Sequence, residues 1–202
     1  MADNCVFCDR SKFEERIIFE NGDFYLIATL GQISDGGYVL IIPKRHVSCL
    51  GALGVGECQQ IMEFEKRVES ALRTEYSDHV VVFEHGIVGQ TVKHAHLHLV
   101  PMRVEMTARI KGDFGRSDVV CLQSLADFHE LYKGNPEPYL LWRDESGILR
   151  VCWNPPAPLQ YLRTVVAEAV GRPERANWRN MDPVLDQQFW FETITRLKPH
   201  LS

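Results

Sequence analysis

The sequence predicts an α+β fold in which an antiparallel β-sheet packs against one long helix, with an α/β extension after it. Short apolar runs typical of strands recur through the first half of the chain. The first two flank the pair Asn21-Gly22, which favours a hairpin. One long stretch, Glu57 to Tyr76, instead has apolar residues at helical spacing. Residues 94–101 alternate histidine with apolar residues, which is the period of a β-strand.

Four strands are expected before the histidine stretch. Ile17 to Glu20 and Phe24 to Thr29 form the predicted hairpin, and residues 31–37 follow as a loop. Tyr38 to Ile42 is a continuous apolar run that ends at a proline, as expected for a buried central strand. His79 to Glu84 is a second core strand.

The predicted helix at residues 57–76 carries Ile61, Phe64, Val68 and Leu72 on one face. The charged residues of this stretch fall largely outside that stripe. This amphipathic pattern predicts a helix with one face against a core.

The second half has a different character. Thr107 to Ser117 is rich in Gly, Lys and Arg and is expected to be mobile, whereas Tyr139 to Trp142 and Ile148 to Trp153 are expected to be strands. Residues 159–170 form an amphipathic pattern that Gly171 ends, and Asp182-Pro183 begins a last helix that runs to about Leu197, before Pro199. We therefore expect a first domain at residues 1–105 and an extension at residues 106–202 packed on it.

Composition bounds the class of protein. The chain has 202 residues, of which 45% are hydrophobic and 24% charged, and its net charge of −5 argues against broad nucleic-acid binding. No apolar stretch approaches the roughly 20 residues that span a bilayer. Residues 1–10 carry acids and cysteines rather than a signal peptide, so we expect a cytoplasmic protein with reduced cysteines.

The three alternate histidines are the first candidate site. In a strand, His94, His96 and His98 would share one exposed face, while the apolar residues between them would enter the core. A chance run on a solvated strand is the alternative. Because imidazole titrates near neutrality, such a row can include a nucleophile, a proton donor and a metal ligand.

Cys5-Val-Phe-Cys8 is the second candidate site, since two cysteines at this spacing can hold one zinc ion. His46, at the end of the predicted central strand, and His94 are available as the other two ligands. Two unrelated reduced cysteines are the alternative, and without zinc His46 and His94 would form the outer part of a histidine relay. A redox pair is less favoured because no βαβ unit follows.

Three elements together resemble the histidine triad (HIT) superfamily. Residues 89–101 resemble its signature, His-φ-His-φ-His-φ-φ with φ apolar, and their Gly-Gln-Thr-Val start resembles the dinucleoside polyphosphate hydrolase branch. Residues 41–46 (Ile-Ile-Pro-Lys-Arg-His) also resemble the family, and the N-terminal cysteine pair resembles that of its zinc-containing members. The resemblance covers roughly residues 5–103. It implies a five-stranded antiparallel sheet with a long helix, and a homodimer.

The resemblance also implies roles for individual residues. His96 would attack the α-phosphorus of a nucleotide to form a nucleotidyl-histidine, and His98 would act on the phosphate or leaving-group side. Gln90 would bind a phosphate oxygen with help from Thr91. The zinc ligands would be Cys5, Cys8, His46 and His94, and this zinc would be structural.

The sequence also departs from the family pattern. Family hydrolases often carry an acidic residue and Asn-Pro in the loop that holds the ribose, followed by Gly-His, whereas this chain has Gly36-Gly37-Tyr38 and no evident ribose acid. Asp35 could replace that acid. His85 could line the pocket or be an ordinary loop histidine. Arg163 and Arg179 could reach a polyphosphate or form surface salt bridges.

The leading functional hypothesis is a nucleotide hydrolase or phosphoramidase that cleaves dinucleoside polyphosphates or phosphoramidates. A nucleotidyltransferase or phosphorylase would use the same intermediate with another acceptor. A nucleotide-binding adaptor module is the alternative from a different class. The expected partner is a nucleotide, with no membrane and no sequence-specific nucleic acid.

Overall fold

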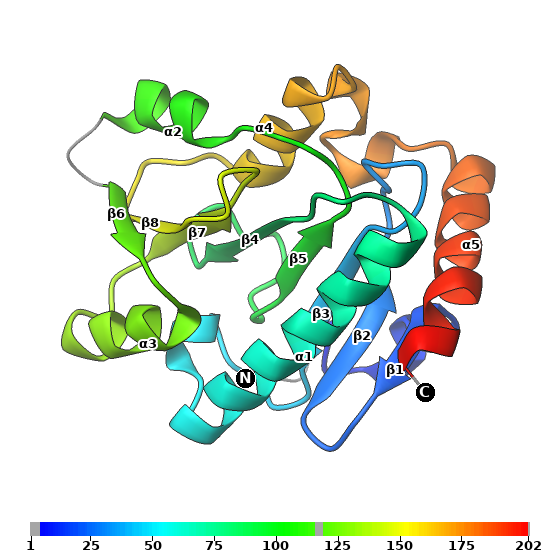
Figure 1. The fold of residues 1–202 in the computed structure, drawn as a ribbon, viewed down its shortest axis with the longest axis horizontal. Coiled ribbons are helices and arrows are strands. Elements are labelled where there is room, and N and C mark those ends of the chain that lie inside the picture. The colour runs from blue at the N-terminus through cyan, green and yellow to red at the C-terminus, as the bar shows by residue number, and fades with distance from the viewer. Residues whose placement is uncertain (1–4, 116–118, 202) are drawn as a thin grey trace.

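A computed structural model describes residues 5–115 and 119–201. These form one antiparallel sheet with helices on both faces (Figure 1), so the α+β prediction is confirmed. The sheet order is β1-β2-β3-β5-β4-β7-β8-β6. The strands are β1 (Ile17–Glu20), β2 (Phe24–Ala28), β3 (Val39–Pro43), β4 (Val81–Gly86), β5 (Leu97–Val100), β6 (Val119–Leu122), β7 (Tyr139–Arg143) and β8 (Leu149–Trp153). The α-helices are α1 (Val55–Glu75), α2 (Thr107–Phe114), α3 (Leu125–Gly134), α4 (Tyr161–Ala169) and α5 (Pro183–Leu201).

The predicted hairpin forms around an Asx-type turn. The side-chain oxygen of Asn21 accepts hydrogen bonds from the backbone N–H groups of Asp23 and Phe24, at 2.9 and 2.8 Å. β2 then pairs antiparallel with β3, and β3 pairs with β5. The sequence placed a strand at residues 94–101, but β5 begins only at Leu97, because His94 and Ala95 bond outside the sheet ladder.

The two halves of the chain share the same sheet. β7 pairs with β4 from Val82↔Arg143 to Gly86↔Tyr139, and β8 and β6 follow it outward. On its other side, β4 pairs with β5. The extension therefore continues the first sheet rather than building a second one.

The helices divide between the two faces. α1 and α5 pack on one face of β2, β3 and β5, and α3 packs on β7 and β8 in a neighbouring cluster. α2 and α4 pack on the opposite face. Along β5, Leu97 and Leu99 enter the α1 core, whereas His98 lies on the face that α4 covers.

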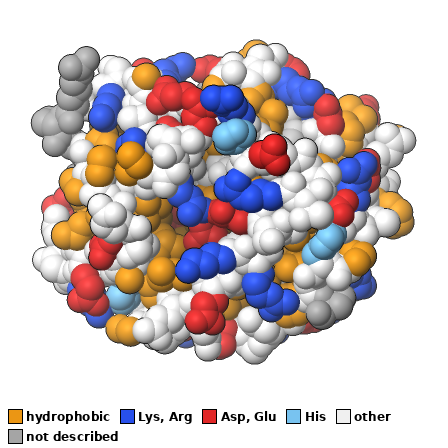
Figure 2. All heavy atoms as spheres, in the orientation of Figure 1, with side chains coloured by type: hydrophobic (Ala, Val, Ile, Leu, Met, Phe, Trp, Pro, Cys, Tyr) orange, Lys and Arg blue, Asp and Glu red, His pale blue; other side chains and the backbone are white. Residues whose placement is uncertain are grey.

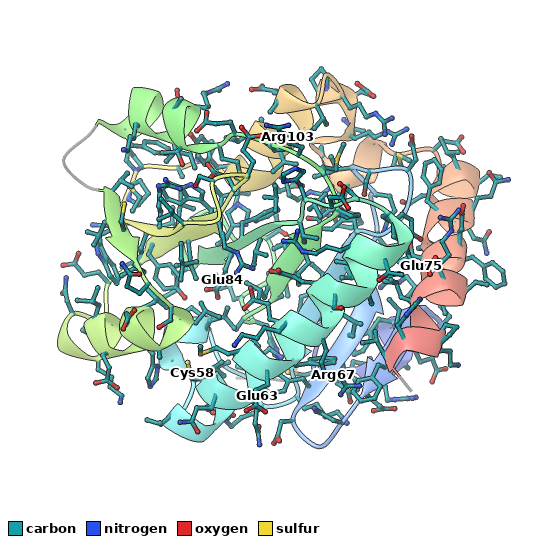
Figure 3. The ribbon with its side chains drawn as sticks, in the orientation of Figure 1. Cys58, Glu63, Arg67, Glu75, Glu84 and Arg103 are labelled. Atoms are coloured by element: carbon teal, nitrogen blue, oxygen red, sulfur yellow. The ribbon has the colours of Figure 1, made fainter. Side chains whose placement is uncertain are left out.

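The long helix α1 agrees with the predicted pattern. Ile61, Phe64, Val68 and Leu72 are all buried in the cluster that joins α1 to the sheet. Charged side chains such as Glu63 and Arg67 lie along its exposed side (Figure 3). Over this face of the molecule Lys and Arg are interspersed with Asp and Glu (Figure 2).

Within the described residues, no helix is both long and apolar enough to cross a bilayer.

The expectation of a mobile segment at residues 107–117 is wrong for residues 107–114, which form α2. Its last residues, 116 and 117, lie outside the described part of the chain. The carboxylate of Asp144 caps this helix by accepting from the N–H groups of Met106 and Thr107 and from the Thr107 hydroxyl. The cap comes from a residue 37 positions away, so local composition could not reveal it.

β6 and α3 were not predicted either. Ser124 caps the start of α3, since its hydroxyl accepts from the N–H of Asp127, and the helix buries Leu125 and Phe128. The two later helices agree with the prediction: Asp182 caps the start of α5, although α5 continues past Pro199 to Leu201.

The carboxylate of Asp186, in α5, holds the loop at residues 29–37. It is buried and accepts from the N–H groups of Gly31 and Gln32, each at 2.9 Å. Gly31 has φ +68°, and a Cβ there would lie 2.3 Å from the Cβ of Trp178, so glycine is required for both reasons. The extension thus shapes the loop in which the family pattern places the ribose.

We predict that Asp186→Ala lowers the free energy of unfolding by about 2–4 kcal/mol, because two buried N–H groups lose their acceptor. Asp186→Asn keeps one acceptor oxygen and should cost clearly less. Urea denaturation of both variants measures the difference. Equal loss in the two variants, or a loss below about 0.5 kcal/mol for the alanine variant, would contradict this role.

Candidate active site and metal centre

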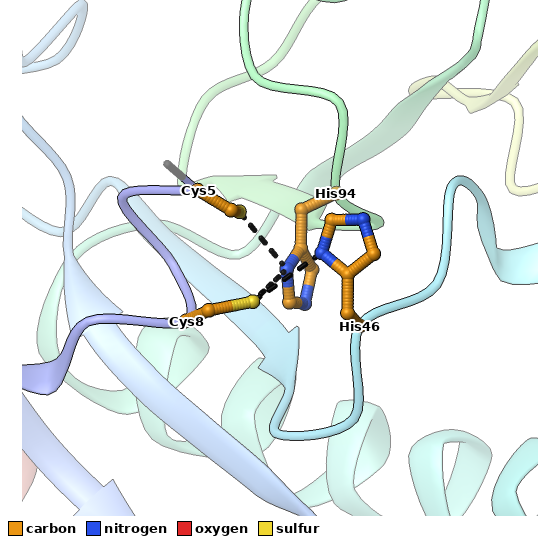
Figure 4. A group of neighbouring side chains, drawn as sticks. All are labelled: Cys5, Cys8, His46 and His94. Atoms are coloured by element: carbon orange, nitrogen blue, oxygen red, sulfur yellow. Dashed lines mark hydrogen bonds between the residues drawn. The ribbon is translucent and has the colours of Figure 1, made fainter. Parts of the chain in front are cut away.

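Two cysteines and two histidines converge beside the N-terminal turn (Figure 4). The ligand atoms of Cys5, Cys8, His46 and His94 all lie within 4.8 Å of one another. The Cys8 sulfur is 3.3 Å from Nδ1 of His46 and 3.5 Å from Nδ1 of His94, and the Cys5 sulfur is 3.4 Å from Nδ1 of His94. Tetrahedral zinc with sulfur and nitrogen ligands places them roughly 3.5 Å apart.

The hydrogen bond on the far side of His94 also suits a metal. Its Nε2 lies 2.8 Å from the carbonyl oxygen of Pro43. Because a carbonyl only accepts, Nε2 carries the hydrogen and Nδ1 keeps a lone pair that faces both sulfurs. A backbone partner of this kind is typical of metal-ligating histidines. The four residues therefore fit a structural zinc ion.

His96 lies next to this cluster with its ring fixed at one nitrogen. Its Nδ1 is 2.6 Å from the carbonyl oxygen of His94, so Nδ1 donates and Nε2 keeps its lone pair. Within the described part of the chain, Nε2 has no hydrogen-bond partner. Phe7, between the two cysteines, packs edge-on against this ring at 5.2 Å between centroids.

His98 lies on the same face as His96, with ring centroids 4.8 Å apart. Phe83 stacks on its ring at 4.4 Å with an interplanar angle of 11°. Its Nδ1 is 2.6 Å from the hydroxyl of Tyr38, and its Nε2 is buried without a partner among the described residues. Nδ1 of His98 is therefore held by Tyr38, whereas Nε2 is free to bond a ligand.

Arg163 enters the site from the first turn of α4. It is buried, and its guanidinium donates to the Tyr38 hydroxyl at 3.0 Å and to the carbonyl of Gly31 at 2.8 Å. It also donates to the carbonyls of Ala176 and Arg175, each at 3.2 Å. Four acceptors of this chain thus occupy most of its donors, so the expectation that it reaches a polyphosphate finds no support in its contacts.

His85, on β4, completes the histidine face. It is buried, and its Nε2 accepts from the backbone N–H of Leu162 at 3.0 Å. Its ring lies 5.9 Å from that of His98. It is therefore not a solvated loop residue but a buried contact between the sheet and α4.

Burial keeps these imidazoles neutral. It lowers the pKa of His96 to about 4 and that of His85 to about 3, with the charge of Arg163 adding to the effect. Burial and the neighbouring imidazoles hold the pKa of His98 well below its usual range.

The prediction that the three histidines share an exposed face is wrong. His94, His96 and His98 are 0%, 7% and 4% exposed, because the N-terminal turn and α4 cover them.

The other predicted site residues are spread around this centre. Gln90 is buried and donates from Nε2 to the carbonyl of Ser48 at 2.8 Å, whereas Thr91 is exposed. Asp35 forms ion pairs with Arg172 and Arg175, so it does not stand free as a ribose acid. Arg179 is exposed and stacks on Trp178.

Sequence reasoning missed the part that Tyr38 plays. Its position was marked only by the departure from the Gly-His of family hydrolases, and its hydroxyl now proves to join His98 to Arg163. Tyr38 and Arg163 are 125 residues apart in the sequence, so no local pattern could predict their contact.

Comparison with known proteins identifies a known domain in the first half of the chain. The family model for the HIT domain matches residues 10–105. An uncharacterized HIT-like protein of Mycobacterium tuberculosis is 30% identical over 104 residues, covering 49% of this chain and 72% of its own. The asymmetrical bis(5'-nucleosyl)-tetraphosphatase of Schizosaccharomyces pombe is 31% identical over 87 residues, or 42% of this chain and 44% of that protein.

Two further matches belong to a longer fusion protein and to a solved structure. The nitrilase and fragile histidine triad fusion protein NitFhit of Caenorhabditis elegans is 29% identical over 139 residues, and this chain spans only 29% of its length. The crystal structure of a zinc-bound histidine triad family protein from Mycobacterium smegmatis is 26% identical, with a TM-score of 0.44 over 51% of this chain and 78% of that one. Because the HIT domain model matches residues 10–105 and a HIT-like relative is 30% identical over 72% of its length, this chain belongs to the histidine triad (HIT) family.

Proposed function

We propose that the protein hydrolyses dinucleoside polyphosphates or nucleoside phosphoramidates through a covalent nucleotidyl-His96 intermediate. The observation that carries this proposal is the hydrogen bond from Nδ1 of His96 to the His94 carbonyl, because it directs the lone pair of a neutral ring to Nε2. A tetraphosphatase among the relatives makes dinucleoside tetraphosphates the first substrates to test.

In the first step, Nε2 of His96 forms a bond to the α-phosphorus and the leaving group departs with the electron pair of its own bond. The ring then carries positive charge, which strengthens the bond from Nδ1–H to the His94 carbonyl. In the second step, water attacks the phosphorus, the P–N bond breaks towards His96, and the water proton leaves with the product or to solvent.

Gln90 and His98 are the proposed phosphate contacts. The Gln90 amide uses one N–H on the Ser48 carbonyl, so a second N–H remains for a phosphate oxygen. Zinc held by Cys5, Cys8, His46 and His94 would be structural and would supply folding stability. Through His94 it would also fix the carbonyl on which His96 depends.

Turnover and adduct formation test the proposal directly. The protein is incubated with diadenosine tetraphosphate and with an adenosine phosphoramidate, each with and without inorganic phosphate, and the products are identified. Release of the mononucleotide without phosphate supports hydrolysis, whereas a phosphate-dependent nucleoside diphosphate would indicate a phosphorylase. No turnover on either substrate and no adduct after an alkaline quench would contradict the enzyme and favour a binding module.

We predict that His96→Ala lowers kcat/KM by roughly 10³-fold or more, because no other imidazole can replace the nucleophile. His79→Ala, which changes a histidine outside this centre, serves as the matched control and should retain activity. Circular dichroism checks that both variants fold. Retained activity in His96→Ala would refute the assignment of the nucleophile.

We predict about one zinc ion per chain in protein purified without chelator. Cys5→Ser should lose the metal and lower the thermal midpoint by several degrees, since structural zinc contributes to folding. Cys121→Ser, which changes an exposed cysteine outside the cluster, is the control and should retain both properties. Elemental analysis and thermal denaturation measure these outcomes, and metal-free wild-type protein would contradict the site.

We predict an unusually acidic limb in the pH dependence of kcat/KM. Burial holds the pKa of His96 at about 4, so the ring is neutral and competent above that pH and loses its lone pair as the pH falls through it. Rates on diadenosine tetraphosphate should therefore stay level from pH 8 to about pH 5. Circular dichroism at each pH checks that the protein stays folded where activity is lost, and a limb near 6.5 would contradict the prediction.

A further inference from the structure

Three side chains from distant parts of the sequence form one line of hydrogen bonds that ends at His98. Arg163 Nη1 lies 3.0 Å from the Tyr38 hydroxyl, and this hydroxyl lies 2.6 Å from Nδ1 of His98. All three side chains are buried. The arginine comes from α4, so the line joins the extension to the HIT domain.

The direction of these bonds follows from their chemistry. A guanidinium only donates, so the Tyr38 oxygen accepts from Arg163. No third polar partner of this hydroxyl is found within the described residues, so its one hydrogen goes to Nδ1 of His98. A neutral imidazole that accepts at Nδ1 carries its hydrogen at Nε2.

The opposite edge of His98 is thereby a hydrogen-bond donor. Its Nε2 is buried and has no partner in the described part of the chain, which is costly unless a ligand completes it. The ring cannot easily tilt away, because Phe83 stacks on it. The neighbouring ring is that of His96, 4.8 Å away between centroids.

We propose that Tyr38 and Arg163 are positioning residues that hold His98 as an Nε2–H donor for a phosphoryl or leaving-group oxygen at His96. The inference rests on the proposed function. The other tautomer would turn a lone pair towards negatively charged oxygens and repel them, so the choice of tautomer affects the reaction. Arg163 orients the Tyr38 hydroxyl without touching the substrate, and its remaining bonds to backbone carbonyls hold it in place.

The tautomer is measured in the resting protein by ¹⁵N NMR of the histidine rings, with the His98 signals assigned by their absence in His98→Gln. The wild type should show Nε2 protonated and Nδ1 as a hydrogen-bonded acceptor. In Tyr38→Phe, which removes only the hydroxyl, the Nδ1 signal should move to that of an unbonded nitrogen and the second tautomer should appear. A wild-type ring protonated at Nδ1, or an unchanged spectrum in Tyr38→Phe, would overturn the inference.

Kinetics supply the second readout. Tyr38→Phe should lower kcat about 10- to 100-fold with little change in KM, as expected for a lost oriented donor. It should lower kcat no further in a His98→Gln background, whereas a merely structural role would lower both equally. Arg163→Lys should shift the His98 signals in the same way, while Arg172→Lys, which changes an arginine paired with Asp35, should leave spectrum and kcat unchanged. The spectra decide the inference even without turnover, and absence of turnover in the wild type would contradict only the proposed function.

Discussion

The pairing of β7 with β4 is the constraint on which the rest of the structure depends. It joins the second half of the chain to the free edge of the HIT sheet and thereby sets α4 over the histidine face. Every contact between Arg163 and the site requires this placement. With β4 paired on both sides, the edge strands of the described sheet are β1 and β6.

The same constraint explains how the loop at residues 29–37 is built without the residues that the family pattern expects there. Asp186 accepts from the backbone N–H groups of Gly31 and Gln32, and Arg163 donates to the Gly31 carbonyl. The extension therefore supplies partners both for backbone donors and for a backbone acceptor of this loop. Buried backbone groups must find such partners, and here the partners are charged, which makes each bond stronger than a neutral one. The loop and the extension are therefore one structural unit.

Residues with local signals were predictable from the sequence, and those that depend on distant contacts were not. The hairpin at Asn21, the apolar stripe on α1 and the cap at Asp182 each depend on residues close together in the sequence, and all three form. α2 depends on a cap from Asp144, and the burial of the histidines depends on α4. α3 is different, because Ser124 and Asp127 give a local capping pattern at its start although this helix was not predicted.

The two reacting imidazoles of the proposed mechanism are oriented in opposite senses by the same device. Each is fixed at Nδ1: His96 donates there to a carbonyl, and His98 accepts there from Tyr38. One Nε2 therefore presents a lone pair and the other a hydrogen, which is the pairing that attack on phosphorus and binding of its oxygens require. The fixing groups differ, because His96 depends on the backbone carbonyl of His94 and His98 depends on a tyrosine held by Arg163. The alternate spacing of the histidines thus specifies where the rings lie, while their hydrogen-bond partners specify what each ring does.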